Sequence, residues 1–176
     1  IILKSYTNNL DPYKEVKKLS NDLVLGIYKE LKNLVLRSDN PFDTALRLAI
    51  AGNIIDYAAN SNFDLQATII KVLSSDFAIN HSKELKAALS KARTVLYIGD
   101  NAGEIVLDKL FIENIMHPNL YFAVRGTPVI NDATIEDAKY IGMEIVADVI
   151  SNGYDAPSTI LNRCSDEFVN LYDRAD

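Results

Sequence analysis

The chain has 176 residues, of which 48% are hydrophobic and 24% charged, the usual balance of a soluble globular protein. Its net charge of −6 argues against a nucleic-acid partner, because binding a phosphate backbone requires clustered Lys and Arg. A single cysteine, Cys164, excludes an intramolecular disulfide and a cysteine-based zinc site. No apolar run reaches the roughly 18–20 residues of a membrane span and no signal-peptide pattern is present, so we expect a cytoplasmic protein without a membrane partner.

The first half of the sequence predicts helices and no strand. The pair Asp11-Pro12 is a helix-start signal, and apolar residues at three- and four-residue steps over 16–34 predict one long amphipathic helix. Asn40-Pro41 repeats the start signal ahead of a second apolar face over 46–58. Shorter helical patterns follow at 64–73 and 82–92.

The second half alternates short apolar runs with helical patterns. The predicted strands are 94–98, 120–124 and 144–150, and the helices between them are 103–115 and 133–141. Near-continuous apolar strands separated by helices are typical of a parallel sheet covered on both faces. We therefore expect an α/β fold, with an all-helical subdomain at 1–92 and a Rossmann-like metal-binding domain at 93–176. A further strand would ordinarily follow the last helical stretch, so we expect the sheet to be incomplete in this chain.

Polar residues follow each predicted strand at the point where it ends. They are Asp100, Asn101 and Glu104 after the first strand, Asn131 and Asp132 after the second, and Ser151, Asn152 and Asp155 after the third. Ligands of open parallel sheets bind beyond the carboxyl ends of the strands. We therefore expect these loops to converge on one crevice.

Asp100, Asn101 and Asp132 predict a divalent metal site. Two carboxylates and an amide carbonyl are hard oxygen ligands that suit Mg²⁺, Mn²⁺ or Ca²⁺. Three protein ligands do not fill an octahedron, so waters or substrate phosphate oxygens would complete it, as in metal-assisted phosphoryl chemistry. Each acidic pair taken alone has a structural alternative, since Asp-Asn is a common turn pair and Asn131-Asp132 suits a helix cap.

Several other chemistries lack their motifs. The sequence contains neither a P-loop nor a G-x-S-x-G elbow, and the isolated His81 and His117 argue against catalytic zinc. Gly99 and Gly103 after a strand partly resemble the first motif of S-adenosylmethionine-dependent methyltransferases, although the glycine usual between them is absent. A methyltransferase and a non-catalytic metal- or ligand-binding module are therefore the alternatives to a phosphatase.

Three stretches resemble signatures of a known family. They are GDNAGEIVLD (99–108), RGTPVINDATIEDA (125–138) and AIAGNIIDYA (49–58), and they are similar to motifs of the metal-dependent damage-control phosphatases, formerly a "domain of unknown function 89" group. The resemblance implies a helical N-terminal part, a Rossmann-like core, and hydrolysis of small phosphate monoesters such as sugar phosphates or damaged metabolites with Mg²⁺, Mn²⁺, Co²⁺ or Ni²⁺. Members of that family continue into a Lys-Gly-containing loop with a phosphate-contacting lysine, and this chain ends before it.

The resemblance also implies roles for individual residues. Asp100, Asn101 and Asp132 match the metal ligands, so Asp100 and Asp132 are the expected catalytic residues, with either water or Asp100 as the nucleophile. The expected substrate-binding residues are Glu104, Asn131, Arg125, Asp137, Asn53 and Asp56. For Arg125 the alternative is a purely structural role. For Asp137 the alternative is a salt bridge or hydrogen bond within the protein. Asn53 and Asp56 share one helix face and are expected to reach the crevice from the helical part, or else to link the two parts. The expected partner is a small phosphorylated metabolite, and a homo-oligomer is left open.

Overall fold

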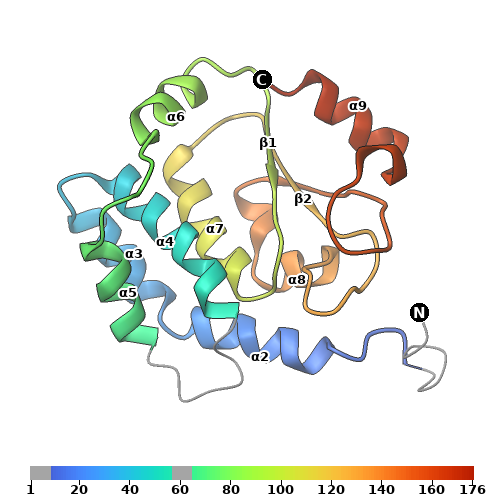
Figure 1. Cartoon of the computed structure of the whole chain (residues 1–176), viewed down its shortest axis with the longest axis horizontal. Coiled ribbons are helices and arrows are strands. Elements are labelled where there is room, and N and C mark those ends of the chain that lie inside the picture. The colour runs from blue at the N-terminus through green and yellow to red at the C-terminus, as the bar shows by residue number, and fades with distance from the viewer. Residues whose placement is uncertain (1–8, 57–64) are drawn as a thin grey trace.

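A three-stranded parallel sheet with helices around it forms the centre of the computed structural model (Figure 1), which describes residues 9–56 and 65–176, without the side chains of 54–56, 65 and 66. The strands β1 (Val95–Ile98), β2 (Leu120–Val124) and β3 (Asp148–Ser151) lie in the order β1-β2-β3. Val95 pairs with Leu120, and Tyr121 pairs with Asp148. The expected α/β class is confirmed. No helix in this described part is long and apolar enough to cross a membrane.

The helices of the first half are α2 (Lys14–Leu25), α3 (Tyr28–Arg37), α4 (Pro41–Asp56), α5 (Leu65–Ser74) and α6 (Ser82–Leu89). In Figure 1, α4 lies beside the central helix α7 (Glu104–Ile115), α3 and α5 lie outside α4, and α2 runs along the lower edge. The remaining elements are α8 (Ile135–Tyr140), α9 (Asp166–Arg174) and the 3₁₀ turns η1 (Met143–Ile145) and η2 (Leu161–Arg163). The expected boundary between residues 92 and 93 stays a prediction.

The prediction of one long helix over 16–34 is wrong. Two helices, α2 and α3, form instead, because the chain turns at Gly26 and Ile27, where Ile27 has φ −109° and ψ 2°. Glycine is a poor helix former, which makes this a favourable place for a break. The predicted apolar face is also wrong within α2: Leu19 is 66% exposed, whereas Lys17 and Asn21 are buried.

The predicted third strand starts too early. Residues of η1 form a 3₁₀ turn after Gly142, whose φ is +71°, and β3 begins only at Asp148. A positive φ suits glycine and redirects the backbone, so Met143 of the turn packs into the core while Ile145 is 83% exposed, and neither residue extends the strand. The predicted helix at 103–115 is confirmed by α7.

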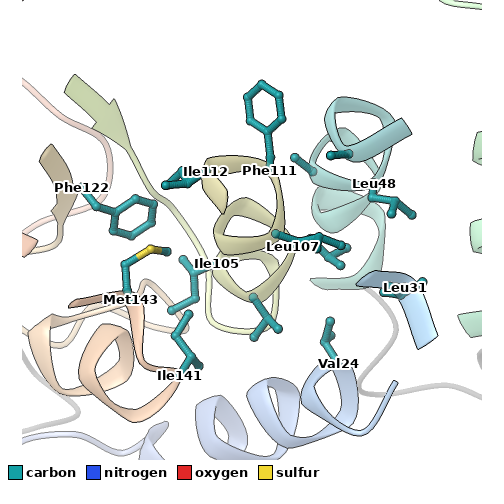
Figure 2. Close-up of a cluster of buried hydrophobic side chains, with 14 of the residues drawn as sticks. Val24, Leu31, Leu48, Ile105, Leu107, Phe111, Ile112, Phe122, Ile141 and Met143 are labelled. Atoms are coloured by element: carbon teal, nitrogen blue, oxygen red, sulfur yellow. The ribbon is translucent and has the colours of Figure 1, made fainter. Parts of the chain in front are cut away.

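Helix α7 lies at the centre of the hydrophobic core (Figure 2). All of its residues from Ile105 to Ile112 are buried, as expected for a helix that is apolar around most of its circumference. On one side Phe111 meets Phe42 of α4 edge to face, with ring centroids 5.3 Å apart. The sheet residue Phe122 lies on the other side (Figure 2). The start of α7, and with it the loop after β1, is therefore held by packing from both the helices and the sheet.

Candidate metal and phosphate site

The loop from β1 to α7 turns sharply at two glycines. A Cβ atom at Gly99 would lie 2.3 Å from Cζ of Phe122, so only glycine fits between the two strands. Gly103 has φ +86° and immediately precedes α7. Asp100 and Asn101 lie between these turns, and the Asp100 side chain is 54% exposed. The tight turn thus presents both side chains at the carboxyl end of the sheet.

The loop after β2 reaches the same place through an unusual backbone conformation. Ile130 has φ +48°, a region that β-branched residues rarely adopt because of steric strain. Asn131 and Asp132 follow directly, and the Asp132 amide donates a hydrogen bond to the carbonyl oxygen of Val129 at 2.9 Å. The strained residue therefore sets the direction in which the next two side chains leave the backbone.

Backbone hydrogen bonds join the two loops. The Ala133 amide donates to the carbonyl oxygen of Asp100 at 2.7 Å, and the Ala102 amide donates to that of Asn131 at 3.0 Å. Asn101 and Asp132 form an antiparallel bridge between these bonds. The two acidic pairs, which are about thirty residues apart in sequence, are therefore neighbours, as the sequence predicted.

Arg125 lies between the two carboxylates. Its guanidinium is 5% exposed, with Nε 2.5 Å from Oδ2 of Asp132 and Nη2 3.9 Å from Oδ1 of Asp100. Its Nη1 also donates a hydrogen bond to the carbonyl oxygen of Ser158. Burial raises the pKa of Asp132, and the nearby charge of Asp100 adds to the rise. The hydrogen bond and the charge of Arg125 and, more weakly, the charge of Lys17 oppose it. Arg125 therefore serves as a fixed positive charge inside an acidic site.

The donor set fits a hard divalent cation. Nδ2 of Asn101 donates to Oδ2 of Asp100 at 3.0 Å and to Oε2 of Glu104 at 3.3 Å, which leaves the amide oxygen as the atom that Asn101 would offer a cation. Within residues 9–56 and 65–176, no three His, Cys, Asp or Glu side chains gather to hold an ion by themselves. The amide of Asn101 would therefore have to complete a site with Asp100 and Asp132.

Asp137 forms the salt bridge that is one of the two roles expected for it. Its Oδ2 accepts hydrogen bonds from the Thr134 amide at 2.9 Å and the Thr134 hydroxyl at 2.7 Å, which caps α8. The same oxygen lies 2.7 Å from Nζ of Lys17. A direct contact of Asp137 with substrate stays a prediction.

The contribution of α4 is partly visible. Asn53 is exposed, and the side chain of Asp56 lies outside the described residues. A Cβ at the neighbouring Gly52 would lie 3.0 Å from Cγ of Glu104, so the last turns of α4 touch the start of α7. Asn53 is therefore close in sequence to a residue that contacts Glu104, and its predicted role in substrate binding remains a prediction.

The loop after β3 folds over Arg125. Asn152 is 2% exposed, its amide donates to the carbonyl oxygen of Val124 at 2.8 Å, and its Oδ1 accepts from the Tyr154 amide at 3.0 Å. A Cβ at Gly126 would lie 2.5 Å from the carbonyl carbon of Gly153, so the two loops are in backbone contact. The third loop thus converges on the site as predicted, and it closes one side of Arg125.

Sequence reasoning missed three buried polar residues around the site, namely Lys17, Asn21 and Asp108. Asp108 carried a usable signal, because a single carboxylate within the apolar run of α7 has to find a partner. Lys17 and Asn21 carried none, since they look like the solvated face of an amphipathic helix.

Comparison with known proteins identifies the family of the chain. Residues 2–176 match the family model described as "Damage-control phosphatase ARMT1-like domain". The chain belongs to this family. The former "domain of unknown function 89" resemblance is confirmed by a crystal structure of a DUF89 family protein from Pyrococcus horikoshii, with a TM-score of 0.87 and 34% identity over 98% of this chain and 61% of that one.

Three curated relatives are similar to this chain, and two of them are named damage-control phosphatases. A damage-control phosphatase of Pyrococcus horikoshii is 36% identical over 99% of this chain and 61% of its own length. A damage-control phosphatase of Archaeoglobus fulgidus is 34% identical over 94% of this chain and 59% of its own length. An uncharacterized protein of Methanocaldococcus jannaschii is 35% identical over 99% of this chain and 60% of its own length. The chain thus spans about 60% of the length of these relatives.

Proposed function

We propose that this protein hydrolyses small phosphate monoesters with a divalent metal ion held by Asp100, Asn101 and Asp132. The observation that carries the proposal is the pairing of the two loops, which brings two carboxylates and an amide together around a buried arginine. A bound Mg²⁺, Mn²⁺, Co²⁺ or Ni²⁺ would offset the phosphate charge and polarise its oxygens. The names of the relatives support a phosphatase and do not favour a methyltransferase.

The side chains of the site have different roles in this proposal. Asp132 and Asp100 supply anionic oxygens, and Arg125 holds Asp132 in place while adding positive charge where a phosphate dianion would lie. Glu104 accepts a hydrogen bond from Asn101 and so fixes the orientation of its amide. In one route, a carboxylate of this group orients a water that attacks phosphorus while the P–O bond to the alcohol breaks. In the other, Asp100 attacks phosphorus and displaces the alcohol, and water then hydrolyses the aspartyl phosphate to release phosphate.

A cavity beside the site offers room for the alcohol part of a substrate. It has a volume of about 610 Å³, and its lining includes Arg125, Thr127, Thr134 and Ser151. Arg125 connects this cavity to Asp132, and the hydroxyl groups can bond to polar substrate atoms. We propose a small phosphorylated metabolite as the partner, with its phosphate toward the carboxylates and its polar body toward this cavity.

Hydrolysis of p-nitrophenyl phosphate with Mg²⁺, Mn²⁺, Co²⁺ or Ni²⁺ tests the proposal. We expect activity that is lost on chelation and restored by metal. The Asp100→Asn variant should lower kcat/KM by about 100-fold or more, because several kcal/mol of charge stabilisation correspond to such a factor. Asp148→Asn, at the exposed start of β3, removes the same charge away from the site and should leave the rate unchanged. Full activity in Asp100→Asn, or turnover that persists in excess chelator, would contradict the proposal.

A non-catalytic metal-binding module is the second candidate. It rests on the same residues, and metal binding without turnover on a broad panel of phosphate esters would favour it. A full-length relative should be assayed beside this chain as a reference, because the chain spans only 61% of that relative's length.

A further inference from the structure

Helix α2 buries two polar residues, Lys17 and Asn21, together with Val24, and exposes two of its leucines. Lys17 and Asn21, one helical turn apart, are 2% and 0% exposed, whereas Leu19 and Leu23 are 66% and 45% exposed. Burying a charge or an amide is costly unless each is paired. The inward face of α2 is therefore organised by specific polar contacts rather than by hydrophobic burial alone.

The first of these contacts holds the loop that carries Asp100 and Asn101. Oδ1 of Asn21 accepts a hydrogen bond from the Gly103 amide at 2.7 Å. Gly103 precedes α7, and the first amides of a helix have no partner within the helix. Asn21 supplies that partner from 82 positions earlier in the chain. The backbone between β1 and α7 is thus attached to α2.

The second contact holds the loop that carries Asp132. Nζ of Lys17 lies 2.7 Å from Oδ2 of Asp137 and 2.8 Å from Oδ2 of Asp11. Asp137 in turn accepts the Thr134 amide and hydroxyl, two residues beyond Asp132. Burial alone would lower the pKa of Lys17, but the hydrogen bonds to Asp11 and Asp137 outweigh it and raise the pKa. Charged Lys17 therefore holds the second loop in place through its ion pair with Asp137.

The arrangement is not the one that stability alone would select. Nδ2 of Asn21 is buried and has no hydrogen-bond partner in the part of the chain that the structure describes. An unpaired buried donor is destabilising, and this cost accompanies the hydrogen bond that Oδ1 of Asn21 accepts from the Gly103 amide. Figure 1 shows α2 passing below the lower end of α7 and below α8, in reach of both loops at once.

We propose that Lys17 and Asn21 are positioning residues of the active site, and that α2 sets the spacing between Asp100 and Asp132 by holding the two loops at Gly103 and Asp137. This inference rests on the proposed function, because it assigns α2 a role in the metal site. The helical part of the chain is then a component of that site rather than only a cover for the sheet.

Mn²⁺ binding to the whole chain, measured from the electron paramagnetic resonance signal of free Mn²⁺, tests the inference. Asn21→Leu removes the acceptor and should weaken binding by about 10- to 100-fold, the usual effect of losing a residue that orients a metal ligand. Asn21→Asp keeps an acceptor oxygen and should restore most of the affinity. Amide hydrogen exchange at Gly103 should be faster in Asn21→Leu and close to wild type in Asn21→Asp.

The second loop has its own matched pair of variants. Lys17→Met releases Asp137, whereas Lys18→Met makes the same change at the exposed neighbouring position. We expect weaker Mn²⁺ binding only in Lys17→Met, at a temperature where circular dichroism shows every variant to be folded. Leu48→Ala, in the core on α4, should lower stability without changing affinity.

The outcomes separate the two proposals. If the wild type does not bind Mn²⁺, the proposed metal site fails and the role of α2 fails with it. If the wild type binds but folded Asn21→Leu and Lys17→Met bind equally well, only the role of α2 is overturned. An equal loss of affinity in Leu48→Ala would also overturn it, because the effect would then follow stability. Should Asn21→Leu not fold, Asn21→Ser replaces it, since the serine hydroxyl is too short to reach Gly103.

Discussion

At the scale of single residues, Asp108 shows how strongly the interior of α7 changes a carboxyl group. Its side chain is 3% exposed, and the Tyr97 hydroxyl donates a hydrogen bond to its Oδ1 at 2.7 Å. Burial raises the pKa of Asp108 to about 8; the Tyr97 hydrogen bond opposes the rise, and nearby Glu104 and Asp100 reinforce it. The group is therefore protonated and neutral in the folded protein near neutral pH.

This raised pKa predicts a pH dependence of stability. An unfolded Asp titrates near pH 4, so between about pH 4 and pH 8 the folded state binds one more proton than the unfolded state. The free energy of unfolding should therefore fall with rising pH in this window, by up to about 1.4 kcal/mol per pH unit from this group. Asp108→Asn cannot ionise and its Oδ1 still accepts from Tyr97, so it should gain stability relative to wild type as pH rises.

Urea unfolding from pH 5 to pH 8.5 checks the expectation. Asp148→Asn, at the exposed start of β3, controls for the loss of one carboxyl group. The same pH slope in wild type and Asp108→Asn would show that Asp108 ionises normally in the folded state.

The residues of the site were predictable to different degrees, for a physical reason. Asp100, Asn101 and Asp132 follow strand ends, and parallel strands bring their carboxyl ends together, so their proximity could be inferred from periodicity alone. Asp137 is 120 positions away from Lys17, and Gly103 is 82 positions away from Asn21, and no local pattern encodes contacts at such separations. Whether the predicted metal ligands bind an ion stays a prediction.

At the scale of elements, Gly99 at the end of β1 packs so closely against Phe122 of β2 that there is no room for a Cβ atom. Phe122 of β2 is fully buried and its ring also stacks on Tyr97 at 5.5 Å between centroids. The ring fills the space where a side chain at Gly99 would lie. Glycine at the end of β1 thus permits the close packing that places Asp100.

Gly99→Ala should therefore destabilise the protein by about 1–3 kcal/mol, the usual cost of overpacking a core. Phe122→Leu removes the ring and should relieve the clash, so the double variant should lose less stability than the two single changes added together. Midpoints and slopes of urea unfolding for the four proteins give the coupling energy. Strictly additive losses would mean that the methyl group and the ring do not meet.

The apolar patterns predicted where helices form better than they predicted which face of each helix is buried. The apolar steps over 16–34 correctly predict helix, yet they place the buried side of α2 on the wrong face. The reason is that hydrophobic periodicity assumes that burial follows apolarity, whereas α2 docks through Lys17 and Asn21. Similarly, the apolar residues after Gly142 favour a strand, and only the left-handed glycine redirects them into η1.

At the scale of the whole molecule, one core cluster runs from α2 and α3 through α4 and α7 to the sheet. Val24 and Leu31 of the first helices belong to the same cluster as Phe122 and Met143 (Figure 2). Because the helices and the sheet share a core, an ion bound at the loops should stabilise the entire chain and not the loops alone. The α/β class followed from the order of the elements, whereas this shared core depends on long-range packing that the sequence pattern does not encode.

Metal binding should therefore raise the unfolding free energy of the whole chain. At a free Mn²⁺ concentration of 100 times its dissociation constant, linkage predicts a gain of about 2.7 kcal/mol if the unfolded chain does not bind the ion. Asp132→Asn should abolish most of this gain because it removes the negative charge of one predicted ligand. Leu48→Ala should lower the baseline stability and keep the gain, since Leu48 belongs to the hydrophobic core and is not a predicted ligand. Urea titrations followed by circular dichroism, with Mn²⁺ and then with excess chelator, measure both quantities. A gain that is equal in wild type and Asp132→Asn would place the ion elsewhere on the protein.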